Sequence, residues 1–343
     1  MTDSAGGLGR AIAATLEGVT LHKVREAGFR NAELNAAQIR SGRNILELRA
    51  SPLADGEAAL VIGAGPSLHR HDVAAVLKAI PSRVTLIATE SAMAYCFRND
   101  IVPDLVVTLD PHAERIVRWF GDPSLTAERL AQDDYFARQD MDPAFAQNQL
   151  RFNGELLAMV NRHGPSVRAA VASSASPAVA KRVAESGMTA YWWNPFYDDY
   201  DLPDSLTRKI HDMNGLPCLN AGGNVGSAAW VIAHAVLGKR HVALAGIDFG
   251  YYPDTPYERT QYYYELIELV GRDRLDEVFV RIPNPHLGIE FYTDPAYLWY
   301  RDAFLQMAAE ADCRTYNCSG GGILFGDSII HESLEAFLTR YSN

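Results

Sequence analysis

The sequence has few cysteines, no long apolar run and no excess of basic residues. Its four cysteines form no C-x-x-C pair and stand at no zinc-finger spacing from a histidine, so we expect reduced thiols rather than disulfides or a structural zinc site. The longest apolar stretches fall short of the roughly 20 residues that a membrane-spanning helix needs. The formal net charge of −11 argues against a protein that binds the phosphate backbone of nucleic acids.

The sequence also lacks internal repeats, low-complexity tracts and the pattern of a targeting signal. Residues 1–4 contain no basic stretch followed by an apolar run, so we expect no signal peptide and a cytoplasmic location. Apolar residues make up 48% of the 343 residues and charged residues 21%, as in ordinary globular enzymes. A chain of this length can form one large domain, with or without an appendage.

Strand and helix patterns alternate from residue 58 onward. Residues 58–62, 84–88 and 105–109 are short apolar runs of the kind found in buried parallel strands. Further strands are predicted at residues 167–171, 190–193 and 242–245 and near Tyr316. The alternation predicts an α/β, Rossmann-like fold, in which helices cover both faces of a mostly parallel sheet.

Two composition shifts suggest how the chain is organised. Residues 8–50 have a helical apolar period, which Ser51-Pro52 and the following Asp55-Gly56 interrupt. We therefore predict an N-terminal helical segment over residues 1–50 and a nucleotide-binding, catalytic domain over residues 51–343. Residues 122–164 are polar, acidic and helix-prone, and are predicted to form an insertion over the sheet.

The strongest local motif is a predicted strand–turn–helix at residues 63–68. Glycines at the end of a buried strand let a ligand approach the backbone, and the N-terminus of the next helix offers free N–H groups to a phosphate. The predicted phosphate-binding residues are Gly63, Ala64, Gly65, Pro66 and Ser67. The structural alternative is a tight turn that needs its glycines for steric reasons alone. Leu68 stands where the dinucleotide fingerprint has its third glycine, so this is not an NAD motif.

Other polar residues follow predicted strands or open predicted helices. Glu90 and Asp110 each come directly after a parallel strand, at the edge where open α/β sheets bind their ligands. Gly226 and Ser227 belong to a second glycine turn before a helix, and Asp248 follows another buried strand. These five residues are candidate nucleotide contacts. Helix capping, a turn after Asp110 and backbone hydrogen bonds to Asp248 are the structural alternatives.

A tyrosine-rich segment and a histidine complete the candidate site. Tyr252 and Tyr257 belong to a group of six tyrosines at residues 251–264, which suits a lid that excludes water and donates hydroxyl groups to a leaving phosphate. His286 lies between prolines in a segment predicted to be a loop, where a histidine can act as a general base near neutral pH. Ordinary packing of the tyrosines and an uninvolved surface histidine are the alternatives.

The order of the motifs resembles the MptE-like and motility-associated-factor (Maf) family over about residues 45–330. The motifs are Gly63-Ala-Gly-Pro-Ser-Leu68, Ile101-Val-Pro-Asp104 before Thr108-Leu-Asp-Pro111, Gly246-Ile-Asp-Phe249, and Tyr316-Asn-Cys-Ser-Gly-Gly-Gly322 with Gly326. In the bacterial branch, the resemblance implies transfer of a sialic-acid-like (nonulosonic) sugar from a CMP carrier to flagellin serine or threonine. In the archaeal branch, it implies a pyrophosphokinase that acts on a hydroxymethyl-dihydropterin with ATP and Mg²⁺.

The sequence is also more distantly similar to bacterial CMP-sialic-acid transferases, through the first glycine turn, Gly226-Ser227 and residues 246–249. This similarity implies an inverting transfer without metal, with His286 as base and tyrosines on the leaving phosphate. Ala64 stands where those transferases have asparagine. The kinase branch pairs two acids around a leucine, and here Thr108 replaces the first, which leaves Asp110 as the implied metal ligand.

The primary hypothesis is therefore a glycosyltransferase that uses a CMP-linked donor and a hydroxyl acceptor, with no metal or other cofactor. Flagellin is an acceptor that the resemblance implies. A diphosphokinase that requires Mg²⁺ and a non-catalytic nucleotide-binding protein are the alternatives. The sequence leaves open whether the protein forms a homo-oligomer.

Overall fold

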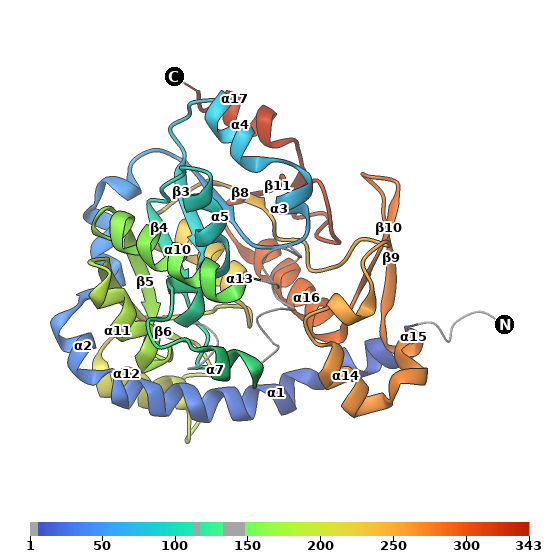
Figure 1. The fold of residues 1–343 in the computed structure, drawn as a ribbon, viewed down its shortest axis with the longest axis horizontal. Coiled ribbons are helices and arrows are strands. Elements are labelled where there is room, and N and C mark those ends of the chain that lie inside the picture. The colour runs from blue at the N-terminus through green and yellow to red at the C-terminus, as the bar shows by residue number, and fades with distance from the viewer. Residues whose placement is uncertain (1–5, 113–116, 133–147, 343) are drawn as a thin grey trace.

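A parallel ten-stranded sheet forms the centre of the molecule (Figure 1). The computed structural model describes residues 6–112, 117–132 and 148–342, and only the backbone of residues 16–24. The strands are β1 (Arg43–Asn44), β2 (Ala58–Ile62), β3 (Thr85–Thr89), β4 (Leu105–Thr108), β5 (Arg168–Ala172), β6 (Thr189–Pro195), β7 (Cys218–Leu219), β8 (His241–Ala245), β11 (Arg314–Asn317) and β12 (Ile329–His331). The predicted Rossmann-like α/β fold is confirmed.

The strand order contains one reversal that positions the candidate site. The order is β1-β6-β5-β4-β3-β2-β8-β11-β12, and β7 pairs with the end of β6. From β2 the chain moves outward through β3, β4, β5 and β6, and it then returns to place β8 on the other side of β2. In open α/β sheets, the crevice at such a reversal is where ligands bind, at the carboxyl ends of the strands. Here that point lies between β2 and β8.

Helices cover both faces of the sheet because its strands are apolar on both sides. One face packs against α13 (Val225–Val231), its continuation η5 (Ile232–Val236) and α16 (Pro295–Glu310). The other face packs against α4 (Val73–Ala79), α5 (Glu90–Arg98), α10 (Gln149–His163), α11 (Pro177–Glu185) and α17 (Leu334–Arg340). Alternate residues of β2 point to the two cores, as the period of a strand requires.

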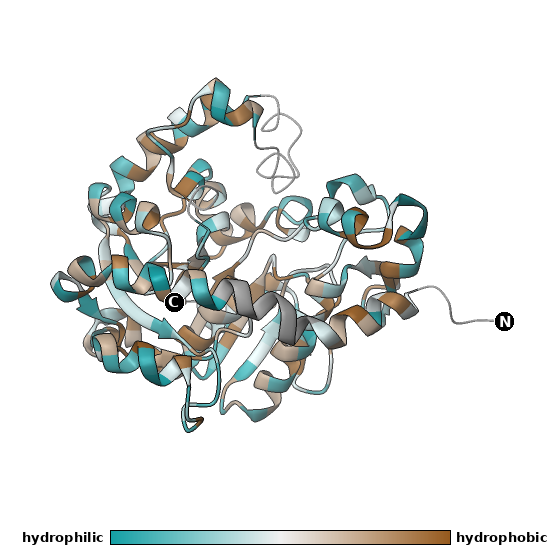
Figure 2. Ribbon diagram, turned by 90° about the horizontal axis from the view of Figure 1, so that it is seen from below, coloured by the Kyte–Doolittle hydropathy of each residue, from teal (hydrophilic) through white to brown (hydrophobic). Residues whose placement is uncertain are grey.

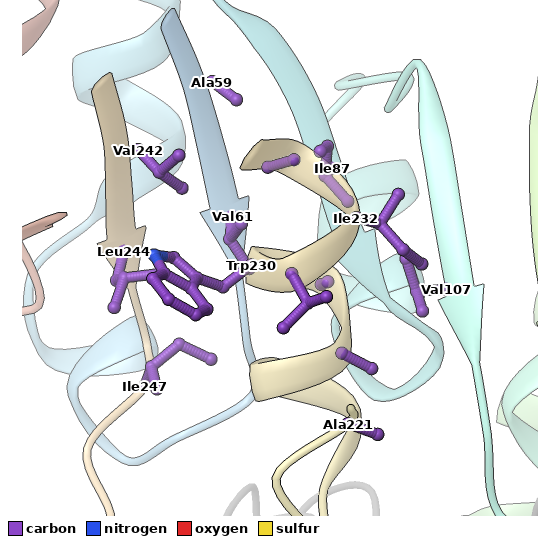
Figure 3. Close-up of a cluster of buried hydrophobic side chains, with 14 of the residues drawn as sticks. Ala59, Val61, Ile87, Val107, Ala221, Trp230, Ile232, Val242, Leu244 and Ile247 are labelled. Atoms are coloured by element: carbon purple, nitrogen blue, oxygen red, sulfur yellow. The ribbon is translucent and has the colours of Figure 1, made fainter. Parts of the chain in front are cut away.

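The core under α13 fixes the helix that carries the second glycine turn. Trp230 and Ile232 project from this helix onto the sheet, where Val61 and Leu244 line the face below them (Figure 3). The Trp230 indole N–H donates to the Thr315 hydroxyl at 3.0 Å, so its polar atom is satisfied in the interior. A buried aromatic ring held this way leaves α13 little freedom to move along the sheet.

The remaining helices lie at the ends and edges of the sheet. They are α1 (Gly7–Leu34), α2 (Ala36–Ser41), α3 (Ser67–Arg70), α7 (Ala127–Ala131), α12 (Leu206–Asn214), α14 (Tyr263–Val270) and α15 (Leu275–Val278). Short 3₁₀ turns are η1 (Ile45–Ala50), η2 (Pro52–Ala54), η3 (Val117–Phe120), η4 (Gly164–Ser166), η6 (Tyr257–Arg259) and η7 (Arg272–Arg274). Seen from below, α1 crosses in front of the strands (Figure 2).

Three segments differ from the sequence expectations or lie beyond them. The α-helical structure predicted to residue 50 ends at Ser41, because Asn44 and Glu47 form a capping box that starts η1, and Ile45 and Leu48 enter the core. The segment predicted as a loop around His286 is a hairpin, β9 (Val280–Asn284) with β10 (Ile289–Thr293). Of the predicted insertion at 122–164, residues 133–147 lie outside the described residues, and α7 and α10 flank them.

All four cysteines are free thiols, and Cys96 and Cys318 are buried. Within the described residues, we find no helix with the length and apolar character needed to cross a bilayer.

Candidate functional site

The first glycine turn (residues 63–68) packs directly against the loop that follows β8. The Gly63 N–H donates to the Ala245 carbonyl and the Gly65 N–H to the Gly246 carbonyl, each at 2.8 Å. A β-carbon at position 65 would lie 2.7 Å from the Gly246 oxygen and 2.8 Å from the Asp248 carboxylate. The close approach of the two loops therefore already requires these glycines, whatever ligand they bind.

Ser67 and Asp248 form a buried bridge between the same two loops. The Ser67 N–H donates to Asp248 Oδ2 at 2.7 Å and the Ser67 hydroxyl to Oδ1 at 2.5 Å, and both residues are almost fully buried. Burial raises the pKa of Asp248 to about 6, although the hydrogen bonds from Ser67 oppose the shift. A carboxylate of the protein thus takes the two donors that we expected to face a phosphate, and the Leu68 N–H donates to the Gly65 carbonyl.

The second glycine turn (residues 221–227) meets the first at Ile247. A β-carbon at Gly63 would lie 2.3 Å from Ile247 Cδ1, and one at Gly226 would lie 2.8 Å from the same atom. Ser227 is fully buried and exchanges hydrogen bonds with the N-cap Asn224, at 2.9 Å from its N–H and 2.8 Å to its hydroxyl. The structure thus brings Gly63 and Gly226 together and gives Ser227 a capping role.

Glu90 and Asp110 form an acidic pair beside these turns, at the ends of β3 and β4. Glu90 is only 4% exposed, and among the described residues its Oε2 atom and the buried Thr108 hydroxyl oxygen make no hydrogen bond of normal geometry. Burial raises the pKa of Glu90 well above its ordinary value and the charge of Asp110 raises it further, although the Thr108 side chain is close enough to lower it. Asp110 is half-buried and accepts a hydrogen bond from the His112 N–H at 2.8 Å. Two acids and a hydroxyl therefore converge on one small region.

Of the two predicted catalytic tyrosines, only Tyr252 lies at the first glycine turn. A β-carbon at Gly321 would lie 2.4 Å from the Tyr252 hydroxyl oxygen and 3.0 Å from Ser67 Cβ, so both side chains reach the same point. The Arg70 guanidinium lies 4.0 Å above the Tyr252 ring. Burial raises the pKa of Tyr252 to about 12, so its hydroxyl is a proton donor at neutral pH.

Tyr257 lies elsewhere, in an aromatic cluster of the α14–α15 region. Its ring stacks on Phe279 at 4.1 Å between centroids, and its hydroxyl donates to Asp276 at 2.9 Å. Residues 251–264 are thus divided between the site and a separate core that holds this segment in place.

Sequence reasoning missed Tyr300, whose pKa is raised by burial and which is close enough to Asp110 for that charge to raise it further. A β-carbon at Gly223 would lie 2.9 Å from Tyr300 Cε1, which places the ring against the second glycine turn. The Tyr262 and Tyr300 hydroxyl oxygens are 3.3 Å apart, and burial raises the pKa of both side chains. Tyr300 projects from the middle of α16, where no sequence motif distinguishes it from the neighbouring aromatic residues.

His286 is exposed in the β9–β10 turn, away from the first glycine turn. Its ring stacks on His331 of β12 with centroids 4.6 Å apart, and it has an edge contact with Phe325 at 6.3 Å. β12 is three strands from β2 in the sheet, which at about 4.8 Å per strand is roughly 14 Å. The ring contacts of His286 are thus with Phe325 and His331 and not with the residues gathered at the switch point.

The fold is that of an α/β protein of the Rossmann-like class, and its candidate site lies at the strand reversal. Residues 30–121 match a family model described as "6-hydroxymethylpterin diphosphokinase MptE-like". This match confirms the predicted MptE-like relationship over those residues, which include the first glycine turn and the acidic pair.

A solved structure is similar to this chain at low sequence identity. It is a Maf glycosyltransferase from Magnetospirillum magneticum AMB-1, with 17% sequence identity and a TM-score of 0.48. The similarity covers 84% of this chain and 38% of that one, so this chain spans well under half of its length. No curated protein matches the sequence.

Proposed function

We propose that this protein is an inverting glycosyltransferase that transfers a nonulosonic sugar from a CMP carrier to a hydroxyl acceptor, such as a flagellin serine or threonine. The observation that carries the proposal is the meeting of the two glycine turns at Ile247, at the reversal between β2 and β8. The motif resemblance to CMP-sugar transferases involves these turns and Gly246-Ile-Asp-Phe249. The carboxyl ends of β2 and β8 suit a nucleotide, because the glycines in the two turns let the backbone approach the phosphate closely.

The proposed reaction is a single displacement at the anomeric carbon. The acceptor oxygen forms a bond to that carbon, the bond from carbon to the phosphate oxygen breaks, and CMP departs with the bonding electrons. A base takes the acceptor proton, and the transition state has oxocarbenium character. The Tyr252 hydroxyl is a donor for the departing phosphate, because its raised pKa keeps it protonated and it lies beside the first glycine turn.

The base in this proposal is Asp110, with His286 as the sequence-based alternative. Asp110 is half-buried at the carboxyl end of β4, in the region that also holds Glu90 and Tyr300. A glycosyl transfer to a hydroxyl group can use a carboxylate as base. Glu90, with its pKa raised by burial, favours the protonated form and suits a hydrogen-bond donor rather than a base.

The nucleotide prediction can be tested by thermal unfolding with CMP, CDP, ATP, GTP and UDP, each with and without Mg²⁺. We expect CMP to raise the melting temperature without Mg²⁺, since a ligand at about 100 times its Kd stabilises the native state by about 2.7 kcal/mol. A shift with ATP alone that EDTA removes would contradict the CMP assignment. A CMP shift without release of CMP from the sugar donor would indicate a binding protein without catalysis.

The second candidate function is a Mg²⁺-dependent diphosphokinase, and the unpartnered Glu90 oxygen favours it. The described residues hold no group of three or more metal-ligating side chains. Mg²⁺ nevertheless often binds through one or two carboxylates and substrate phosphates. Glu90, Asp110 and the Thr108 hydroxyl supply oxygen atoms of the right kind, and a cation would satisfy the buried Oε2 atom. It would neutralise the charge on the phosphate that is attacked.

Glu90→Gln separates the two candidates. If the kinase proposal holds, the variant should lose the Mg²⁺-dependent part of the ATP response, because an amide is a weaker cation ligand than a carboxylate. If the transferase proposal holds, the CMP response without metal should remain. Glu335→Gln, at an exposed position on α17, is the matched control for the loss of one carboxylate. Isothermal titration with MgATP measures both effects.

A further inference from the structure

Helix α1 covers the carboxyl ends of β4, β5 and β6, at some distance from the two glycine turns. The Asn31 side chain donates to the Pro111 and Ser174 carbonyls, each at 2.9 Å. The buried Asn35 side chain donates to the Ser173 and Ala175 carbonyls at 3.0 and 2.8 Å. Figure 1 shows α1 running along this edge of the sheet below β5 and β6. The helix is therefore fixed to the loops that follow these strands.

Arg25 of this helix has no partner for its charge among the described residues. Its Nε atom is buried and makes no hydrogen bond, and no carboxylate of the described structure forms an ion pair with it. A buried guanidinium N–H without a partner is costly, and the cost disappears when an anion binds.

Tyr197, which follows β6, provides a second unsatisfied donor at the same place. A β-carbon at Gly28, one helical turn after Arg25, would lie 2.2 Å from the Tyr197 hydroxyl oxygen and 3.0 Å from Ser174 Cβ. That hydroxyl is buried and makes no hydrogen bond of normal geometry among the described residues. Burial raises the pKa of Tyr197, although the Ser174 side chain is close enough to lower it. The charge of Arg25 also lowers it, so the phenol and the guanidinium lie near one another.

We propose that Arg25 and Tyr197 bind an anionic group, a carboxylate or a phosphate, of the second substrate. A guanidinium presents parallel N–H groups that fit both kinds of oxygen anion, and a neutral phenol adds one more donor. Among the described groups at this edge, the Arg25 Nε–H and the Tyr197 hydroxyl make no hydrogen bond of normal geometry, whereas the neighbouring Asn31 and Asn35 amide groups donate to carbonyls. The site therefore requires an acceptor that the described chain does not provide.

The position of the site identifies the second substrate rather than the sugar donor as its ligand. This step rests on the proposed function. The loops after β5 and β6 lie three and four strands from β2, which is roughly 14–19 Å at about 4.8 Å per strand. The carboxylate of a nonulosonic donor is bonded to the same anomeric carbon that carries the phosphate. With the phosphate at the first glycine turn, that carboxylate cannot reach Arg25, so the anion belongs to the acceptor.

The test compares Arg25→Gln with Arg30→Gln, an exposed arginine on the same helix. Thermal unfolding is measured with sodium phosphate and with sodium acetate, against sodium chloride at equal ionic strength. Because phosphate also stabilises proteins by exclusion from their surface, the measured quantity is the difference between the two variants. We expect Arg30→Gln to show the same rise in melting temperature with phosphate or acetate, relative to chloride, as the wild type. Arg25→Gln should lose the part of this rise that comes from anion binding at Arg25. Arg25→Lys should restore part of this rise in melting temperature, because lysine keeps the positive charge. If only phosphate or only acetate raises the melting temperature in this way, that salt identifies the class of anion that binds.

The same experiment separates ligand binding from a structural role. Because the Arg25 Nε–H has no hydrogen-bond partner among the described residues, Arg25→Gln should keep or raise the melting temperature without ligand. A fall of several degrees, or equal anion responses in the two glutamine variants, would overturn the proposal. The CMP response of Arg25→Gln should equal that of the wild type. If CMP fails to bind either protein while the anion response still depends on Arg25, the proposed function fails and the anion site remains.

Discussion

Asp248→Ala should lower the free energy of unfolding by several kcal/mol, whereas Asp248→Asn should change it much less. Alanine leaves the Ser67 N–H and hydroxyl buried without an acceptor, at about 1–3 kcal/mol for each unsatisfied group. Asparagine can keep both contacts: its oxygen accepts from the Ser67 N–H, and its NH₂ group donates to the Ser67 hydroxyl oxygen. The two variants thus distinguish loss of the hydrogen bonds from loss of the charge.

The pH dependence of stability provides a second signature of this bridge. Burial raises the pKa of Asp248 to about 6 in the folded protein, against about 3.9 in an unfolded chain. The stabilisation associated with protonated Asp248 is fully present below pH 3.9 and is lost as the pH rises through 6. Two pKa units correspond to on the order of 3 kcal/mol, so the stability of Asp248→Asn relative to the wild type should increase by about that amount between pH 4 and 7.

Urea unfolding at several pH values measures both effects. Asp254→Ala is the matched control, since Asp254 is exposed and its ion pair with Arg70 at 2.7 Å contributes at most about 1 kcal/mol. Equal losses of stability in Asp248→Ala and Asp248→Asn would show that the charge, and not the hydrogen bonds to Ser67, holds the two loops together. A pH-independent difference between the wild type and Asp248→Asn would contradict the raised pKa.

The sequence predicted the sheet and the glycine turn well because both have local signals. The runs at 58–62 and 242–245 are apolar throughout, as strands buried on two faces require, and they became the strands on either side of the reversal. The Ser67–Asp248 bridge joins residues 181 positions apart. No local pattern shows that the donors of the turn are taken by an acid from another loop, so the phosphate prediction assigned them to a ligand.

Further features that the sequence did not reveal also depend on tertiary contacts. Because Pro283 and Pro285 flank this segment, the sequence predicted a loop around His286. Pro283 is nevertheless tolerated in β9, because the hairpin has only two strands and stands outside the main sheet. Tyr300 and Arg25 lie in helices with many aromatic or charged residues, and only the packing of α16 and α1 on the strand ends distinguishes them. The residue types were visible in the sequence, but their distances from the first glycine turn were not.

Asp110→Asn should reduce the rate of transfer by about 10²–10⁴-fold, the usual contribution of a general base. The carboxylate lies at the strand ends with Glu90 and Tyr300, so an amide in its place keeps the shape of the site and removes only the proton acceptor. CMP affinity should change little, because a base acts on the acceptor proton and contributes to the chemical step. The measurement is CMP release from a CMP-linked nonulosonic donor under single-turnover conditions, with water as acceptor.

His286→Ala is the decisive comparison for the identity of the base. The His286 ring stacks on His331 of β12, which lies five strands from β4 and Asp110 in the strand order. The loss of His286 should therefore change the rate of CMP release only a few-fold. Asp327→Asn, at an exposed position, controls for the loss of one negative charge. If His286→Ala instead shows the large loss and Asp110→Asn does not, the β9–β10 hairpin must move over the donor during the reaction. The rate should then also fall at acid pH with an apparent pKa of roughly 6–7, the range of histidine.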